Sequence, residues 1–290
     1  MPDAAADATT HLPPDAGAAG NADAARRAAE AASARAPLVR PSPVQGAAVS
    51  PTPALRYKRA LVKISGEALA GDRGGGFGFD FEVIERFADE IKDAVELGGE
   101  IGLVIGGGNI VRGSHLHQKG MDRVTADYMG MLGTVINALA LQDILERRGV
   151  DTRVMTAIRM EALAEPYIRR RALRHFEKKR TVIFAAGTGN PYFTTDTGVV
   201  LRAIEMQADV IIKATSVDGI YSADPKLHPQ ATRYEELQYR DVMRDELRVM
   251  DQTAITLCKE NGLPLIVLNL HTPRAVSRAI RGERIGTLVR

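Results

Sequence analysis

The sequence predicts an α/β fold, a three-layer αβα sandwich with a mostly parallel central sheet. Beyond about residue 55, short runs rich in Val, Ile and Leu alternate with longer segments of helical periodicity. Continuous apolar runs are typical of strands that are buried on both faces of a sheet. Strands that alternate with helices favour parallel pairing through right-handed crossovers, which place helices on both faces.

The expected strands are short and contain β-branched or leucine residues. They cover residues 60–64, 101–105, 153–156, 182–186, 210–213 and 265–269. Residues 285–289 fit an antiparallel edge strand, whereas residues 234–241 fit a surface connection with a short strand or helix.

Helical periodicity fills the segments between these strands. It covers residues 81–97, 126–148, 165–178, 197–207, 251–261 and 273–280. The helix at 126–148 is apolar on more than one side, a pattern that indicates burial either in the core or in a subunit interface. Both alternatives stay open from the sequence.

The first part of the chain differs from the rest. Residues 1–54 consist largely of Ala, Pro, Asp and Gly, with hardly any large apolar side chain and no aromatic one. Ordering such a segment would cost entropy that burial does not offset, so we expect a disordered tail followed by one domain over residues 55–290. The tail lacks the apolar core of a secretion signal, and its early acids disfavour an organellar presequence.

Composition narrows the class of protein. A formal net charge of +2 creates no general field that attracts nucleic acid, and we interpret the basic residues at 169–180 as a solvated helix face. The single cysteine, Cys258, allows no internal disulfide, which fits a reducing compartment, so a cytoplasmic location is expected. No apolar stretch approaches the roughly 20 residues that span a bilayer, so no membrane association is expected.

Three turns rich in glycine or small polar residues follow expected strands. The carboxyl ends of parallel strands meet at one edge of a sheet, where open α/β sheets bind ligands. Glycines there allow backbone N–H groups to approach phosphate oxygens, so we expect one site for a polyanion. For each turn alone, tight geometry without a ligand is the alternative. The turns are Lys63-Ile64-Ser65-Gly66-Glu67, Gly106-Gly107-Gly108-Asn109 and residues 188–196.

Lys63 and Arg112 are candidate phosphate ligands. Lys63 closes an apolar strand, where an unpaired buried ammonium would be costly but a side chain at the strand end can reach a site. Arg112 follows the second turn, and its planar guanidinium can bind phosphoryl oxygens. The alternatives are a lysine whose stem covers apolar surface and an ordinary surface arginine. The second turn matches neither the dinucleotide fingerprint nor the phosphate loop that ends in Gly-Lys-Ser/Thr.

Asp196 and Lys213 are further candidates. Asp196 follows two threonines at an expected helix start, so helix capping competes with a role in the site. Lys213 ends another apolar strand, and the loop after it has hydroxyls, carboxylates and an aromatic ring that suit a nucleoside and its phosphates. Turn formation alone would also explain the Asp, Gly and Pro of this loop. The loop residues are Thr215, Asp218, Gly219, Tyr221 and Asp224.

These residue types together favour phosphoryl transfer. The reaction needs aligned reactants, with cations and amides that meet the charge on the transferred group, and little covalent chemistry from the protein. We interpret His115-Leu116-His117 as part of a polar loop rather than as a metal site. Hydrolase and zinc-enzyme alternatives are therefore disfavoured.

Longer motifs run through the same turns. They are Lys63-Ile64-Ser65-Gly66-Glu67-Ala68-Leu69, Ile105-Gly106-Gly107-Gly108-Asn109-Ile110-Val111-Arg112-Gly113, Asp127-Tyr128-Met129-Gly130-Met131 and Gly187-Thr188-Gly189-Asn190-Pro191-Tyr192-Phe193-Thr194-Thr195-Asp196. With these motifs the chain resembles the bacterial uridylate kinases, hexameric enzymes of the amino-acid kinase superfamily. The resemblance covers about Tyr57 to Arg290. The glycine turn is shared across the superfamily, whereas the last two motifs are typical of the uridylate branch.

The resemblance implies transfer of the ATP γ-phosphate to UMP, which gives UDP in pyrimidine nucleotide biosynthesis, with Mg²⁺ carried by the nucleotide and no metal site in the protein. It implies UMP binding mainly by the N-terminal half and ATP binding mainly by the C-terminal half. The implied catalytic residues are Lys63, Arg112, Asp196 and Lys213, with Asp196 organising the lysines. The implied ATP ligands are Lys63, Ile64, Ser65, Gly66, Gly108, Arg112, Thr215, Tyr221 and Asp224. The implied UMP ligands are Gly107, Asp127, Thr188, Gly189, Asn190, Pro191, Tyr192, Phe193, Thr194 and Thr195, with Asp127 on the ribose hydroxyls.

Regulation and assembly are also implied by the resemblance alone. Members of the family are typically homohexamers that GTP activates and UTP inhibits. The stretch that matches the GTP-responsive region also fits a flexible turn, and no role for residues 1–54 follows from the family pattern. The stretch consists of Gly71, Asp72, Arg73, Gly74, Gly75, Gly76, Phe77 and Gly78.

Two alternatives remain for the function. A superfamily kinase that phosphorylates a carboxylate or carbamate would share Lys63 and the glycine turn, but it would not need Asp127 or the loop at 188–195. A non-catalytic sensor of uridine nucleotides could use the same phosphate-binding turns. It would have no need for Lys63, Arg112 and Asp196 around a transferred phosphoryl group.

Overall fold

A computed structural model describes residues 54–71, 77–223, 225, 227–228, 230–247 and 249–290. These residues lie in one compact unit, Pro51–Arg290. The expected tail, apart from Ala54, lies outside the described residues, as do Asp224 and residues 72–76.

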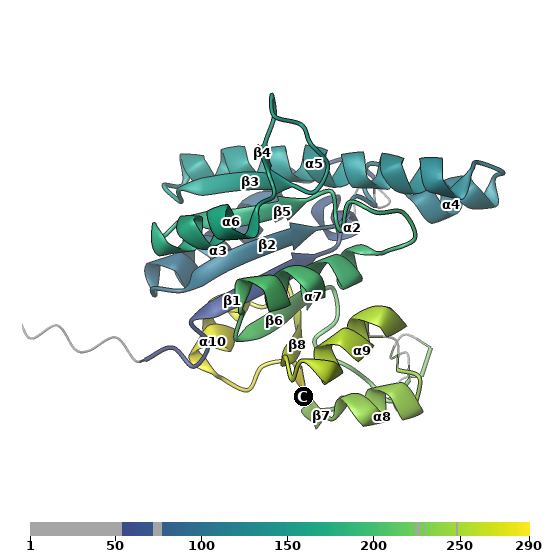
Figure 1. Ribbon diagram of the computed structural model, residues 1–290. Helices are drawn as coiled ribbons and strands as arrows, with labels where there is room; N and C mark the ends of the chain where they lie inside the picture. The colour runs from purple at the N-terminus through teal and green to yellow at the C-terminus, as the bar shows by residue number, and fades with distance from the viewer. Residues whose placement is uncertain (1–53, 72–76, 224, 226, 229, 248) are drawn as a thin grey trace, which may run out of the picture. The chain divides into compact units, whose positions relative to one another are not determined.

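One sheet runs through this unit, and its neighbouring strands are parallel except for the antiparallel pair β8 and β9 (Figure 1). Its strands lie in the order β4-β3-β5-β2-β1-β6-β8-β9-β7. Their bounds are β1 Arg59–Ile64, β2 Glu100–Ile105, β3 Thr152–Thr156, β4 Glu165–Pro166, β5 Thr181–Ala185, β6 Val210–Thr215, β7 Glu236–Leu237, β8 Leu265–Asn269 and β9 Thr287–Val289. The predicted strands are confirmed to within two residues.

Helices cover both faces of the sheet, as the alternating pattern predicted. On one face α3 contacts α5 and α10, and on the other α7 contacts α6 and α9, which in turn contacts α8. The helix bounds are α2 Gly66–Leu69, α3 Phe81–Glu96, α4 Gly113–Gln118, α5 Arg123–Arg147, α6 Arg169–Glu177, α7 Thr195–Met206, α8 Tyr239–Arg244, α9 Gln252–Glu260 and α10 Ala275–Arg281.

The core consists of two clusters, one on each face of the sheet. On β1, Val62 and Ile64 pack in the cluster of α3, α5 and α10, whereas Leu61 packs in the cluster of α6, α7 and α9. This division follows from the alternation of side chains along a strand. Phe87 and Phe176 are among the largest fully buried side chains of the two clusters. The three-layer prediction is therefore confirmed.

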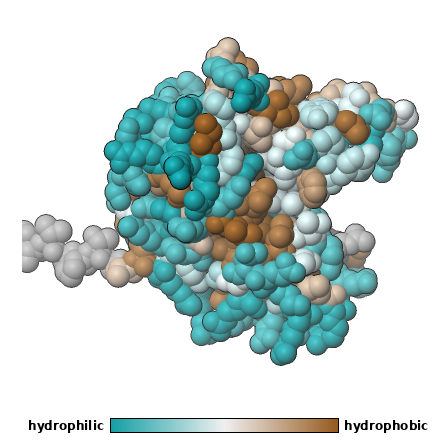
Figure 2. Space-filling model, viewed as in Figure 1, coloured by the Kyte–Doolittle hydropathy of each residue, from teal (hydrophilic) through white to brown (hydrophobic). Residues whose placement is uncertain are grey.

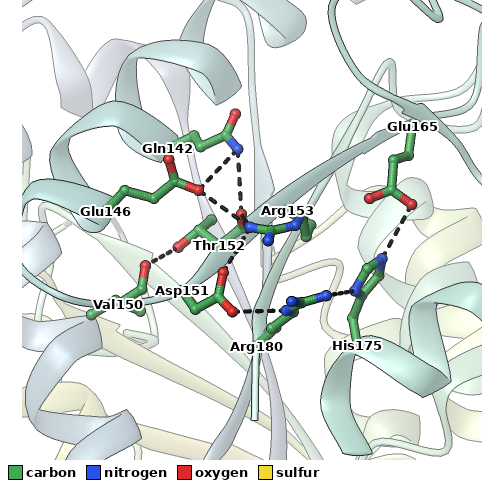
Figure 3. A network of polar contacts seen from close by, with 9 residues as sticks. All are labelled: Gln142, Glu146, Val150, Asp151, Thr152, Arg153, Glu165, His175 and Arg180. Carbon is green, nitrogen blue, oxygen red and sulfur yellow. Dashed lines mark hydrogen bonds and ion pairs between the residues drawn. The ribbon is translucent and has the colours of Figure 1, made fainter. Parts of the chain in front are cut away.

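The expected helix at 165–178 is wrong in its first part. Residues Glu165–Pro166 form the edge strand β4 beside β3, and α6 begins only at Arg169. An edge strand tolerates Pro166 because one side of it needs no ladder hydrogen bond. Figure 3 shows Glu165 facing His175, with 3.2 Å between a carboxylate oxygen and the ring Nε2, at the end of a polar network that includes Arg180 and Asp151.

Other local expectations also need correction. His115 and His117 lie in the short helix α4 rather than in a loop. Strand β9 is not an edge strand, because β7 pairs with its outer side. The connection at 234–241 contains both β7 and α8, where the sequence predicted one short element. Arg169 and its basic neighbours on α6 are exposed, and Ala172 and Phe176 are buried, as predicted for a solvated helix face.

Helix α5 combines two kinds of surface. An 18-residue window of it has a mean hydropathy of 1.3, so by length and composition it could cross a bilayer, which the sequence reading had excluded. Its buried residues, such as Leu141, instead belong to the core cluster that it shares with α3. Tyr128, Leu132 and Ile136, spaced by four residues, are 43–47% exposed and form a stripe on one helix face.

Two isoleucines on α5 test which of its faces packs within the unit. Ile144→Ala should lower the free energy of unfolding by about 2–5 kcal/mol, because Ile144 is 1% exposed. Ile136→Ala should cost less than about 1 kcal/mol in dilute solution, because Ile136 is 45% exposed. Denaturant unfolding at two protein concentrations measures both. An Ile136 effect that grows with concentration would indicate a subunit contact, and equal effects in dilute protein would contradict the packing described.

Candidate active site

The site begins with two lysines on neighbouring strands. In the parallel pairing of β1 with β6, Lys63 lies opposite Lys213. Partners in a ladder point to the same face of a sheet. Leu61 and Ile211, two residues earlier on each strand, pack in the cluster of α6, α7 and α9. The two ammonium groups are therefore directed to the face that α7 covers, close to the carboxyl ends of their strands.

Asp196 in the first turn of α7 bridges the two lysines. Its Oδ1 lies 2.8 Å from Nζ of Lys63, and its Oδ2 lies 2.9 Å from Nζ of Lys213. The side chains of the three residues are only 11–16% exposed. Lys213 Nζ also donates a hydrogen bond to the carbonyl oxygen of Val249. The structure thus brings three of the predicted catalytic residues together in a buried cluster with one net positive charge.

Burial and charge oppose each other in this cluster. Burial favours the neutral form of Asp196, but the ammonium groups of Lys63 and Lys213 outweigh it and hold the pKa of the carboxyl below its usual range. Burial lowers the pKa of Lys213; the carboxylate of Asp196 opposes this shift, and the charge of Lys63 adds to it. Asp196 is therefore ionised at neutral pH.

A residue other than Asp196 caps α7, so helix capping does not explain why Asp196 lies there. Thr194 is the N-cap of α7, and its hydroxyl accepts hydrogen bonds from the backbone N–H groups of Asp196 and Thr197. The same hydroxyl donates to Oδ2 of Asp251. Because Thr194 satisfies the helix start, the carboxylate of Asp196 is left for the lysines.

Three adjacent cavities lie at this edge of the sheet, and lysines of the cluster line the two larger ones. Lys63, Lys213 and Arg112 line a cavity of about 720 Å³. It shares Lys213 and Thr215 with a cavity of about 710 Å³ that Tyr221 also lines. It shares Arg112 and Glu67 with a third cavity of about 420 Å³. Figure 2 shows the surface hollowed between the part that holds α4 and the part that holds α8 and α9, with apolar side chains gathered at its inner side.

The glycine turns fit tightly at the junction of these cavities. A Cβ on Gly66 would lie 2.5 Å from Oδ1 of Asn109, and one on Gly107 would lie 2.5 Å from the carbonyl oxygen of Gly130. Such distances require glycine, because a side chain atom would overlap with polar backbone or a buried amide. Glycine at both positions therefore allows the two turns and helix α5 to pack this closely.

Two buried amides fix the second turn on α5. Asn109 Nδ2 donates to Oδ1 of Asn137 at 3.0 Å, and Asn137 Nδ2 returns a bond to Oδ1 of Asn109 at 2.7 Å. Asn137 also donates to the carbonyl oxygen of Gly106, and Thr134 of α5 accepts from the backbone N–H of Ala186. Helix α5 therefore holds the ends of both β2 and β5. Asn109 lies in one of the motifs of the sequence, but no local pattern predicts its pairing with Asn137.

Arg112 lies between two cavities rather than in one. Its Nε is 3.1 Å from Oε1 of Glu67, and its guanidinium lies 5.1 Å from the ring centroid of Phe77. Both Arg112 and Glu67 line the 720 Å³ and the 420 Å³ cavities. A cation in this position can contact a phosphoryl group that passes from one cavity to the other. Glu67 was not predicted as a site residue.

The predicted acceptor residues divide into two groups. Gly107, Asp127 and the 188–195 loop at Thr188, Phe193, Thr194 and Thr195 line the 420 Å³ cavity. Gly189, Asn190, Pro191 and Tyr192 belong to the same loop but are not among the described residues that line it. Oδ2 of Asp127 accepts from Nε of Arg123 and from the backbone N–H of Tyr192, both at 2.8 Å. Arg123 is a cavity residue that the sequence reading missed.

The predicted ATP residues lie around the two larger cavities. Ser65 lines the 720 Å³ cavity and caps α2, whereas Gly108, although predicted as an ATP residue, lines the 420 Å³ cavity and not the larger two. Thr215 lines both larger cavities, and the hydroxyl of Tyr221 donates to Asp218 at 2.6 Å. The side chain of Ile64 is buried in the core, so only its backbone is left for a ligand.

The ends of the predicted regulatory stretch lie beside the site. Gly71 lines the 720 Å³ cavity, Phe77 stacks near Arg112, and Gly78 exchanges hydrogen bonds with Asn109. Asp72, Arg73, Gly74, Gly75 and Gly76 lie outside the described residues, as does Asp224.

Comparisons with known proteins agree with this geometry. The family model described as amino acid kinase family matches residues 58–269. The solved structure of a UMP kinase from Bacillus anthracis is 46% identical with a TM-score of 0.78, and the match covers 80% of this chain and 96% of that chain. A UMP kinase from Ureaplasma parvum is 38% identical with a TM-score of 0.74, with coverage of 81% and 99%. A uridylate kinase from Archaeoglobus fulgidus is 26% identical with a TM-score of 0.62, with coverage of 80% and 99%.

The depressed pKa of Asp196 predicts how its contribution to stability varies with pH. In an unfolded chain the pKa of an aspartate is about 3.9. A lower pKa in the folded state stabilises the protein above that pH, and this stabilisation is lost as pH falls through the folded pKa. Asp196→Asn should therefore destabilise the protein by roughly 3–5 kcal/mol at pH 7, because two buried ammonium groups lose their partner. The difference from wild type should shrink below about pH 4. Denaturant unfolding from pH 3 to 8 measures it, and a constant difference would contradict the ion pairs.

Proposed function

The chain belongs to the amino acid kinase family, and from this premise we propose that it is a UMP kinase, a phosphotransferase that moves the γ-phosphate of ATP to UMP and gives UDP. One observation carries the proposal: Lys63 and Lys213, bridged by Asp196, line a cavity of about 720 Å³ that adjoins a smaller cavity at Glu67 and Arg112. Two lysines in the larger cavity and Arg112 at the junction suit the charge that spreads over a moving phosphoryl group.

In this proposal the three cavities divide the substrates between them. The 710 Å³ cavity, with Thr215 and Tyr221, takes the nucleoside of ATP, and the 720 Å³ cavity takes its phosphates. The 420 Å³ cavity, with Asp127 and the 188–195 loop, takes UMP. The nucleoside of ATP then contacts the C-terminal half, its phosphates contact both halves, and UMP contacts mainly the N-terminal half together with the 188–195 loop. Arg112, which lines two of the cavities, contacts the phosphoryl group between them.

Asp196 acts in this mechanism as an organiser of cations. Both of its oxygens are engaged by lysines, and its pKa is lowered, so it is a weak proton acceptor. The acceptor oxygen belongs to a phosphate whose second pKa is about 6, so it is largely ionised at neutral pH and needs no base. The chemistry therefore depends on alignment and charge, which Lys63, Lys213 and Arg112 provide.

The residues also fit a magnesium ion that the nucleotide carries. Of the carboxylates that line the 720 Å³ cavity, Glu67 pairs with Arg112 and Asp80 caps α3, so these donors suit an ion held mainly by phosphate oxygens. When bound, Mg²⁺ neutralises phosphate charge.

The family resemblance supports several finer proposals. We propose a cytoplasmic homohexamer that acts in pyrimidine nucleotide biosynthesis, with GTP as activator and UTP as inhibitor, and with no membrane or nucleic acid as partner. The exposed stripe of Tyr128, Leu132 and Ile136 on α5 supports subunit contact. The position of Gly71 and Phe77 beside the phosphate cavity supports a regulatory role for the stretch at 71–78.

An assay with several acceptors tests the proposed function. We expect ATP consumption with UMP, weaker consumption with CMP, and none with acetylglutamate or aspartate. Product analysis should find UDP. Activity with an amino acid but not with UMP would favour a carboxylate kinase of the same family. Binding of UMP and ATP without turnover would favour a nucleotide sensor.

Replacing Lys63 separates chemistry from binding. Lys63→Ala should lower kcat by about two orders of magnitude or more, because the cation at the transferred phosphoryl group is lost. The Kd for UMP, measured by calorimetry, should change by less than about threefold. Lys92→Ala is the control, because Lys92 is an exposed lysine on α3 that pairs only with Glu96 among its described neighbours. A matched loss of UMP binding would indicate that Lys63 supports the acceptor site instead.

A further inference from the structure

Asp251 connects the parts of the site without lining it. It precedes α9 and caps that helix by accepting a hydrogen bond from the backbone N–H of Ala254 at 2.9 Å. Its carboxylate also accepts from the hydroxyls of Thr194 and Thr197, the latter at 3.0 Å. Asp251 is not among the described residues that line the three cavities.

The hydroxyl of Thr194 depends on this contact for its orientation. A threonine hydroxyl has one hydrogen to donate and two lone pairs to accept with. Because the hydrogen of Thr194 is directed to Asp251, its lone pairs are left for the backbone N–H groups of Asp196 and Thr197, at 3.0 and 3.4 Å. A charged acceptor strengthens the first bond, and hydrogen bonds in a chain polarise one another.

The same short segment also holds a catalytic lysine. Two residues before Asp251, the carbonyl oxygen of Val249 accepts a hydrogen bond from Nζ of Lys213. The segment 249–251 therefore contacts Lys213 through its backbone and the start of α7 through its carboxylate. Asp196 in α7 and Lys213 in β6 form the ion pair between these two contacts.

We propose that Asp251 is a positioning residue for the phosphoryl acceptor: it fixes Thr194 and the first turn of α7, and through them the wall of the acceptor cavity and the carboxylate of Asp196. Thr194 and Thr195 line that cavity, so a shift of the cap displaces ligand contacts directly. The backbone contact to Lys213 does not need the Asp251 side chain. Loss of the Asp251 side chain should therefore weaken the binding of UMP more than that of ATP.

This inference rests on the proposed function and predicts a split in kinetic constants. Asp251→Ser retains a good N-cap for α9 but loses the charge and the reach to Thr194. We expect KM for UMP to rise about tenfold, because hydrogen bonds to a charged acceptor are lost, and kcat to fall severalfold. KM for ATP should change by less than about twofold. Asp251→Asn retains an acceptor oxygen and should restore KM for UMP to within about threefold of wild type.

Two controls separate positioning from general stability. Asp241→Ala removes part of the capping box of α8, whose residues Tyr239–Arg244 are not among the described residues that line the 420 Å³ cavity, and should leave KM for UMP unchanged. A variant that merely unfolds in part lowers the amount of active enzyme, and hence Vmax, without changing KM. Wild-type turnover of UMP, measured first, tests the proposed function alone. If wild type is active and Asp251→Ser has the wild-type KM for UMP, or if the Asn variant is as impaired as the Ser variant, the positioning role is refuted.

Discussion

The register between β1 and β6 is the constraint on which the rest of the site depends. It places Lys63 beside Lys213 on a buried face, where two ammonium groups repel each other and lose solvation. A carboxylate between them compensates both charges, which the buried packing requires whatever its part in the proposed reaction. Asp196 meets both requirements only if α7 begins at the correct residue. The sheet register, the start of α7 and the charge of the site therefore depend on one another.

The two sides of the site differ in how firmly they are held. Lys63 and Lys213 lie in central strands that are paired on both sides. The acceptor side consists of a loop between β5 and α7, in which Gly187, Gly189 and even Tyr192 have positive φ angles. A tyrosine rarely adopts such a backbone conformation, so the loop depends on outside contacts. The bonds from Tyr192 N–H to Asp127 and from Thr194 to Asp251 are such contacts.

Local patterns in the sequence were sufficient for much of the fold. Apolar runs located the central strands, and glycine turns after them located the ligand edge. The Lys63–Asp196–Lys213 cluster was implied only by the family resemblance, because no local pattern encodes strand register. Asn109 and Asn137 are 28 residues apart, and Thr194 and Asp251 are 57 apart, so their pairing depends on the tertiary fold. At Glu165 helical periodicity continued across residues that pair with β3, and tertiary pairing prevailed over the local pattern.

Helix α5 links the acceptor side to a surface that is open in the single chain. Its inner face holds the end of β2 through Asn137 and the end of β5 through Thr134, and Gly130 packs against Gly107. Its outer face carries the apolar stripe that includes Leu132. The side chains that hold the glycine turn and the start of the acceptor loop, and the apolar stripe, are therefore carried by two faces of one helix.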